Sequence, residues 1–196
     1  MEIHPVVLTG KKVRLEPLHI SHLESLTSVG LDPELWSFIP TQVRSADDMR
    51  AYVSTALDEM QKGISLPFVI IDQANGSVIG STRYSNIVPA HRRLEIGWTW
   101  VIPSHQKTAA NTEAKLLLLT HAFETLGAMR VEFKTDALNQ KSRRAILRLG
   151  ATEEGTFRKH VHMDTGRVRD SVYFSIIDSE WSAVKKNLTD VLAARP

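Results

Sequence analysis

The sequence predicts a single α/β (α+β) domain with a mixed, mostly antiparallel sheet of six to seven strands flanked by helices. Three observations lead to this fold class. Short segments with a two-residue apolar alternation occur beside longer segments with a helical apolar period. Residues 93–135 are predicted to form a strand, a loop, a helix and a second strand, the order of a crossover connection. The 196 residues contain no repeat and no linker rich in Ser, Gly or Pro, so 1–196 is expected to be one domain.

The N-terminal part of the chain is predicted to contain one strand and two helices. Lys11–Pro17 alternates apolar and polar residues, as a half-buried strand does. His19–Val29 is predicted as a short helix and Leu35–Pro40 as an aromatic connector. Ser45–Lys62 is the clearest helix, because apolar residues recur at helical spacing after a capping Ser, and Gly63 follows its end.

The rest of the chain alternates predicted strands and helices. Strands are expected over Leu66–Ile71, Val78–Asn86, Arg93–Val101, Arg130–Thr135, Thr152–His162 and Arg167–Ile177. Helices are expected over Thr112–Leu126, capped by Asn111 or Thr112, over Asn139–Leu149 and over Glu180–Ala194.

Composition excludes several classes of protein. There is no cysteine, so a disulfide scaffold and a catalytic thiol are excluded. The net charge is only +2, which does not favour a nucleic-acid partner. The longest uncharged stretch, Ile96–Gln106, is shorter than the ~20 residues of a membrane span, and no signal peptide is evident. We therefore expect a cytoplasmic protein with no membrane partner. His160 and His162 share a strand face without a third ligand, so no metal site is predicted.

The segment from Val101 to Lys115 carries the clearest functional signal. An apolar strand leads into a loop of small residues, and this loop leads into a helix. The first backbone N–H groups of a helix have no partner within the helix, and the helix dipole adds positive potential there. An anion such as a pyrophosphate is the natural ligand of this arrangement.

This segment resembles the acyl-CoA loop of the GNAT superfamily of N-acyltransferases. The family pattern Arg/Gln-x-x-Gly-x-Gly/Ala aligns with Gln106–Asn111, where Ala109 and Asn111 depart from it. Other segments resemble the RimJ/RimL-like branch in the same order and spacing. These are Leu8–Leu18, Leu94–Trp98, Ala122–Gly127, Asn139–Ser142, Leu149–Ala151, Arg158-Lys159 and Arg169–Ser175. The resemblance covers about residues 8–177, with 180–194 as a terminal helix, and implies a GNAT-like domain.

The resemblance implies acetyl-CoA, or another acyl-CoA, as cosubstrate. Pantetheine is then expected along the strand end at Trp100, Val101 and Ile102. The phosphates are expected on the following loop and helix start, at Gln106, Lys107, Thr108, Ala109, Ala110, Asn111 and Thr112. Asn139 is expected to contact the cofactor arm, and the Ser142 hydroxyl to reach the thioester region. Because positive φ costs a non-glycine residue ~1–2 kcal/mol, Ala109 is expected to have a negative φ.

Two residues are expected to act in catalysis. A GNAT enzyme needs a base, because the amine that attacks the thioester must first lose a proton. Glu95 is the candidate base, since it lies on the strand implied to carry the chemistry. Strand alternation predicts that Glu95, Gly97, Thr99 and Val101 share one face. The Tyr that often serves as general acid is replaced by Ile146, so either Ser142 or water is expected to protonate the departing thiolate, or no acid is needed.

The acceptor pocket is expected to involve residues from three segments. They are Trp36 and Phe38 on the early connector, Arg83 and Tyr84 on the strand before Glu95, and Trp98 beyond it. A strand arginine among apolar neighbours favours an acceptor that carries a carboxylate.

The leading hypothesis is therefore an acyl-CoA-dependent N-acyltransferase, most simply an N-acetyltransferase. It would transfer the acyl group to a primary amine, either a protein N-terminus or a small molecule. The alternative is a catalytically inactive CoA-binding protein. A homodimer is a possible assembly by analogy with the branch.

Overall fold

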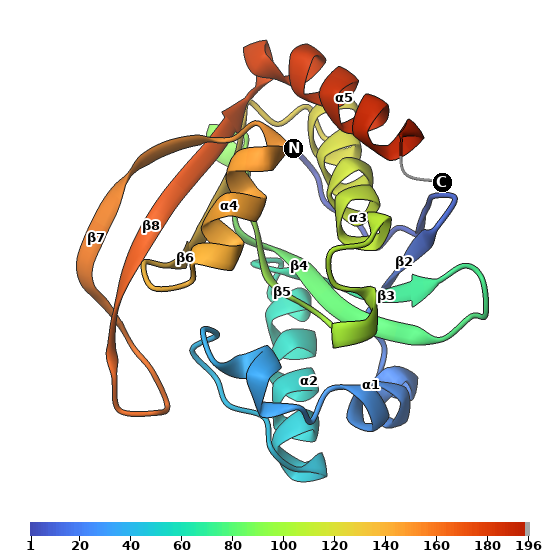
Figure 1. The fold of residues 1–196 in the computed structure, drawn as a ribbon, viewed down its shortest axis with the longest axis vertical. Coiled ribbons are helices and arrows are strands. Elements are labelled where there is room, and N and C mark those ends of the chain that lie inside the picture. The colour runs from blue at the N-terminus through green and yellow to red at the C-terminus, as the bar shows by residue number, and fades with distance from the viewer. Residues whose placement is uncertain (195–196) are drawn as a thin grey trace.

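Eight strands form one sheet in the computed structural model, which describes residues 1–194 (Figure 1). They are β1 (Leu8–Thr9), β2 (Val13–Pro17), β3 (Leu66–Asp72), β4 (Val78–Val88), β5 (Arg93–Val101), β6 (Arg130–Asp136), β7 (Thr152–His162) and β8 (Val168–Ile177). Their order in the sheet is β1-β2-β3-β4-β5-β6-β8-β7. All neighbours are antiparallel except β5 and β6, which are parallel. The mixed, mostly antiparallel sheet is confirmed.

The strand count exceeds the predicted six to seven because of β1. Its two residues, Leu8 and Thr9, pair with Leu15 and Arg14 of β2. Two residues are too few for an alternation pattern to be visible in the sequence, so this strand could not be predicted from periodicity.

Helices cover both faces of the sheet. They are α1 (Leu23–Val29), α2 (Ala46–Gln61), α3 (Ala109–Thr120), α4 (Gln140–Leu149) and α5 (Asp178–Ala193). Helices α1 and α2 bury Leu26, Met49 and Val53 in one core with Trp36 and Trp100. Helices α3, α4 and α5 pack on the opposite face, in a second core with side chains from most of the strands.

Short irregular helices join these elements. They are η1 (Ile20–His22), η2 (Pro33–Trp36), η3 (Pro89–His91), η4 (Pro103–His105) and the π-helical turn η5 (His121–Thr125). The predicted helix at 112–126 therefore begins three residues earlier, at Ala109, and changes to a π-turn after Thr120. Its cap is Thr108, whose Oγ1 accepts a hydrogen bond from the Ala110 N–H at 3.2 Å, and not Asn111 or Thr112.

A β-bulge interrupts β5 at Trp98. Ser81 on β4 pairs with Trp100 and Arg83 pairs with Gly97, so two residues of β5 lie opposite Thr82 alone. Trp98 has a φ of 52°, which is uncommon for a bulky residue. The bulge shifts the alternation by one residue. Glu95 and Gly97 keep a common face, but the predicted shared face with Thr99 and Val101 is wrong.

Candidate active site

The two parallel strands pair only at their beginnings. Arg93, Leu94 and Glu95 of β5 pair with Arg130, Val131 and Glu132 of β6, and the ladder ends there within the described residues. Beyond Glu95 the two strands diverge, and each leads into a helix, α3 after β5 and α4 after β6 (Figure 1). The point of divergence therefore exposes a stretch of β5 backbone beside two helix N-termini.

The loop before α3 follows directly from the end of β5. Thr108 caps the helix, and Lys107 takes the positive φ of the loop, at 63°. Ala109 is the first helical residue and is not among the residues with positive φ, which confirms the expected negative φ. An alanine β-carbon is therefore accommodated at the position where the family pattern has glycine.

The loops before α3 and α4 are joined by side chains. Lys141 on α4 contacts the Gln106 Oε1 atom, and Gln106 Nε2 donates to the Val101 carbonyl at 2.7 Å. The Ile102 N–H donates to Ile79 at 2.9 Å. Any ligand that pairs with the end of β5 must therefore use other backbone groups than the Ile102 N–H.

The start of α4 shows a capping interaction. The Asn139 Oδ1 atom accepts a hydrogen bond from the Ser142 N–H at 3.0 Å. Asn139 is thus an N-cap, and both residues lie in the turn that follows β6. On α3, the Asn111 Oδ1 atom is buried without a hydrogen-bond partner among the described residues. An N–H donor of a ligand would satisfy this acceptor.

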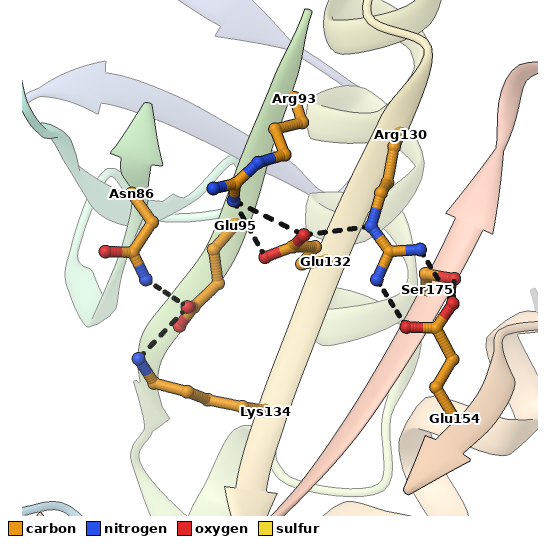
Figure 2. Close-up of polar contacts among 8 residues, drawn as sticks. All are labelled: Asn86, Arg93, Glu95, Arg130, Glu132, Lys134, Glu154 and Ser175. Atoms are coloured by element: carbon orange, nitrogen blue, oxygen red, sulfur yellow. Dashed lines mark hydrogen bonds and ion pairs between the residues drawn. The ribbon is translucent and has the colours of Figure 1, made fainter. Parts of the chain in front are cut away.

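Glu95 lies at the point of divergence and is 1% exposed. Two side chains converge on its Oε2 atom, Asn86 from β4 at 2.6 Å and Lys134 from β6 at 3.1 Å (Figure 2). Asn86 reaches it because β4 bulges between Ser85 and Val88, and Asn86 has a φ of 46°. Asparagine tolerates this backbone conformation better than most residues.

The other carboxylate oxygen of Glu95 faces Gly97. A β-carbon built on Gly97 would lie 2.7 Å from Glu95 Oε1 and 3.8 Å from Ser85 Oγ. The Ser85 hydroxyl is buried and has no hydrogen-bond partner among the described residues. The missing side chain of Gly97 therefore leaves a small space between a carboxylate oxygen and an unpaired hydroxyl.

A cavity of about 840 Å³, which Ser85 also lines, lies on the sheet face that carries α2. Ser85, Asn86, Trp98, Lys134 and Tyr173 are among its lining residues. The ring centroids of Tyr173 and Phe157 lie 4.6 Å apart, and burial raises the pKa of the Tyr173 hydroxyl.

Charged side chains along the cavity wall are paired with one another. Arg93 and Arg130 both bond Glu132, and Arg130 also contacts Glu154 (Figure 2). The hydrogen bond to Arg130 lowers the pKa of Glu154. The wall therefore offers little uncompensated charge to an acceptor.

Two predicted acceptor residues are buried in the core and do not line the cavity. Trp36 is fully buried in the core, where its Nε1–H donates to the Gly30 carbonyl at 2.8 Å. Tyr84 is also fully buried, and its hydroxyl donates to the Leu118 carbonyl of α3 at 2.6 Å, on the opposite face of the sheet. Both are structural residues, and their prediction as acceptor contacts is wrong.

Arg83 does not present its charge to the cavity. It is 2% exposed, pairs with Glu59 at 3.0 Å and packs between the rings of Tyr52 and Trp98. Arg83 is thus paired with Glu59, and its predicted contact with a carboxylate-bearing acceptor stays a prediction. Trp98 does line the cavity. Phe38 is half-buried in its loop, where its carbonyl accepts a hydrogen bond from Arg169.

Sequence reasoning missed four residues that surround Glu95 or the cavity: Ser85, Asn86, Lys134 and Tyr173. Lys134 reaches Glu95 only through the register of β5 and β6, in which Glu132 pairs with Glu95, and no sequence signal shows this register. Asn86 and Ser85 depend on the β4 bulge, which leaves no alternation signal.

Two features are absent from residues 1–194. No three His, Cys, Asp or Glu side chains are grouped so that they could hold a metal ion. None of the helices in this part of the chain is long and apolar enough to cross a membrane.

Known proteins resemble this chain in sequence and in fold. The family model "Acetyltransferase (GNAT) domain" matches residues 12–152. The chain is 33% identical over 111 residues to "Putative ribosomal N-acetyltransferase YdaF" of Bacillus subtilis (strain 168), a match that covers 57% of this chain and only 60% of that relative. It also resembles the crystal structure of a GCN5-related N-acetyltransferase from Brucella melitensis, with 32% identity, a TM-score of 0.89, and coverage of 97% of this chain and 86% of that one.

The fold is shared more widely. Mycobacterium smegmatis RimJ in complex with CoA-disulfide has a TM-score of 0.83 at 23% identity, with 95% of each chain covered. The family match includes both diverging strands, the loop between Val101 and α3, and the start of α4. The chain belongs to the GNAT acetyltransferase family.

Proposed function

We propose that this protein transfers an acetyl group from acetyl-CoA to a primary amine by direct attack of the amine on the thioester. The observation that carries the proposal is the position of Glu95. This buried carboxylate is the last residue of β5 that pairs with β6, so it lies where the two strands open.

The cofactor site is proposed from the groups around this opening. The N-terminus of α3 supplies backbone N–H groups and dipole potential for the phosphates of CoA. The backbone of β5 beyond Glu95 has no β6 partner and is available to pair with pantetheine. The unpartnered Asn111 Oδ1 atom is a further acceptor for a ligand N–H. These features support the sequence-based placement of the CoA arm between α3 and α4.

Glu95 is proposed as the general base. An ammonium ion has no lone pair, so the acceptor must lose a proton before it attacks the carbonyl carbon. Asn86 and Lys134 hold the Oε2 atom, which leaves Oε1 free to accept that proton directly or through a water. The C–N bond then forms, the C–S bond breaks, and the sulfur leaves as the thiolate of CoA. Ser142 or water remains the proposed source of the proton for that thiolate.

The acceptor amine is proposed to bind in the space left by the missing side chain of Gly97. A nitrogen placed there can donate to Glu95 Oε1 and to the Ser85 hydroxyl, which has no hydrogen-bond partner among residues 1–194. The neighbouring cavity, with Trp98 and Tyr173 in its wall, then holds the rest of the acceptor. Because its charges are internally paired, the wall favours a primary amine on a largely uncharged carrier, such as a protein N-terminus or a small molecule.

The decisive experiment measures CoA release from acetyl-CoA with a pooled set of amines and N-terminal peptides, followed by detection of acetylated products by mass. Glu95→Gln keeps the shape of the side chain and removes its basicity, so kcat should fall by ~10²–10⁴-fold. Binding of CoA, measured by isothermal titration calorimetry, should hardly change. Ser85→Ala should raise the KM of the amine and leave the KM of acetyl-CoA unchanged.

Two results would reject the proposal at different points. If CoA binds but no amine is acetylated by the wild-type protein, the non-catalytic CoA-binding alternative stands. If turnover occurs and Glu95→Gln stays within threefold of the wild type, the base is another group.

A further inference from the structure

A single lysine on α3 is buried beneath the bulge of β5. Lys115 is 6% exposed, and its Nζ atom donates to Thr99 Oγ1 at 2.6 Å and to Thr82 Oγ1 at 3.2 Å. No carboxylate of residues 1–194 forms an ion pair with it. Burial lowers its pKa to about 7. An uncompensated buried charge is costly, so this lysine is poorly explained by stability alone.

The two threonines connect Lys115 to the bulge. Thr82 is the β4 residue opposite the two extra residues of β5, and Thr99 is one of those two. Their hydroxyls lie 2.8 Å apart. Each also points at the Gly97 carbonyl, with long contacts of 3.5 Å from Thr82 and 3.4 Å from Thr99.

The direction of these hydrogen bonds follows from the lysine. An ammonium group can only donate, so both hydroxyl oxygens act as acceptors toward Lys115. Their hydrogens are then free to point at Gly97 or at each other. Hydrogen bonds thus run from Lys115 through the two threonine hydroxyls to the Gly97 carbonyl. On the opposite face of the strand, Gly97 lies next to the Oε1 atom of Glu95.

We propose that Lys115 is a positioning residue for acyl transfer, which fixes the bulged segment Gly97–Thr99 through Thr82 and Thr99. This inference rests on the proposed function, because the bulge matters only if the thioester and the amine meet beside it. A shift of the bulge changes the distance between Glu95 and any acyl group lying along β5. Misplacement of reacting groups by about 1 Å can reduce the rate ~10²-fold.

The main test is Lys115→Met, which keeps a similar length and removes the charge. We expect kcat to fall roughly 10–100-fold, with the KM of acetyl-CoA within about threefold of wild type. The melting temperature should stay equal or rise, because a buried charge is removed and the two hydroxyls still bond each other. A residue that served stability only would lower both the melting temperature and the activity. Lys186→Met, at an exposed lysine of α5, is the matched control and should change neither.

The threonine variants show whether Lys115 acts through Thr99. Thr99→Val removes the hydroxyl and keeps the shape, so it should reduce kcat as Lys115→Met does, and the double variant should be no worse than either single variant. Thr99→Ser restores the hydroxyl and should recover most of the loss. If Lys115→Met fails to fold, the Val and Ser pair decides the question.

Amide hydrogen exchange separates this inference from the proposed function. Exchange in the segment Leu94–Val101 should be faster in Lys115→Met than in wild type, whether or not an acceptor amine has been found. Unchanged exchange there would overturn the inference, as would a kcat within twofold of wild type in an active enzyme. An inactive wild-type protein with faster exchange in the variant would instead reject the proposed function and keep the link between Lys115 and the bulge.

Discussion

The Glu113 side chain connects the start of α3 to the N-terminal strands by hydrogen bonds, and its replacement by glutamine should measurably lower the free energy of unfolding. Glu113 is 8% exposed, and its carboxylate accepts three backbone hydrogen bonds. The Lys11 N–H donates to Oε1 at 3.0 Å, and the Lys12 and Val13 N–H groups both donate to Oε2 at 2.7 Å. These donors lie about 100 residues away in the sequence, so one side chain links the turn between β1 and β2 to α3.

The magnitude follows from what glutamine can and cannot replace. If its amide oxygen takes the Oε2 position, the bonds from Lys12 and Val13 survive but are no longer charge-assisted, which costs about 1 kcal/mol each. Its NH₂ group then faces the Lys11 N–H, and one bond is lost for roughly another 1 kcal/mol. The sum is ~3 kcal/mol. For a chain of this size, that corresponds to a fall of roughly 6–12 °C in melting temperature.

Thermal unfolding followed by circular dichroism measures the effect. Glu24→Gln, at an exposed glutamate of α1, is the matched control and should leave the melting temperature unchanged within about 1 °C. A Glu113→Gln protein that melts within about 1 °C of wild type would refute the reasoning.

Gly10 gives an independent check of the same contact. A β-carbon at Gly10 would lie 2.4 Å from Glu113 Oε2, and Gly10 has no positive φ, so only this contact opposes a side chain there. Gly10→Ala should therefore destabilise the wild type. It should cost much less in a Glu113→Ala background, where the clashing atoms are absent. Additive losses in the double variant would show that the clash is elsewhere.

Three further predictions concern the opening between the strands and the helix beside it. Asn139→Ala removes the cap of α4 and should lower the free energy of unfolding by ~1 kcal/mol, or the melting temperature by a few degrees. A raised KM for acetyl-CoA would show that Asn139 also contacts the cofactor, whereas an unchanged KM would show that it acts only as a cap. Ala109→Gly should change CoA affinity by less than about threefold in calorimetry, because Ala109 already has helical backbone; a large gain in affinity would show that its β-carbon obstructs the phosphates. The pKa of Lys115 is lowered from 10.5 to about 7, so above pH 7 the unfolded chain holds a proton that the folded chain lacks. Stability should therefore rise with pH relative to Lys115→Met, by ~2 kcal/mol between pH 7 and 9 in urea unfolding; parallel curves for the two proteins would contradict the assignment.

The sequence identifies elements whose signals are local. The helix α2 follows from the Ser45 cap, whose side chain accepts from the Asp48 N–H, and from an uninterrupted apolar period. The strand β5 and the loop after it are likewise visible, because an apolar strand, a capping residue and a helix follow one another directly. Glu95 could be singled out for the same reason, as a carboxylate in an apolar strand. Its partners Asn86 and Lys134 lie on neighbouring strands, and only the register of the sheet brings them to it.

The errors share one physical cause, which is that burial partners are non-local. The sequence around Arg83 predicts an exposed or ligand-binding arginine, whereas the structure pairs it with Glu59 of α2. Tyr84 reads as a pocket residue until its hydroxyl is seen bonded to the Leu118 carbonyl across the core. The bulge at Trp98 is hidden because period-two alternation assumes an unbroken strand, and one extra residue moves every later side chain to the other face.

Gly97 explains why this irregular stretch of β5 is where the chemistry is proposed. Its backbone does not require glycine, because its φ is not positive. The need is for space, since a β-carbon would lie 2.7 Å from the free oxygen of Glu95. On the other face, the hydroxyls of Thr82 and Thr99 approach the Gly97 carbonyl, and Lys115 donates to both hydroxyls. Gly97 thus lies between Glu95 Oε1 on one face and the hydroxyls bonded to the Lys115 amine on the other. Substitution of Gly97 by alanine would therefore place a β-carbon against the Glu95 carboxylate.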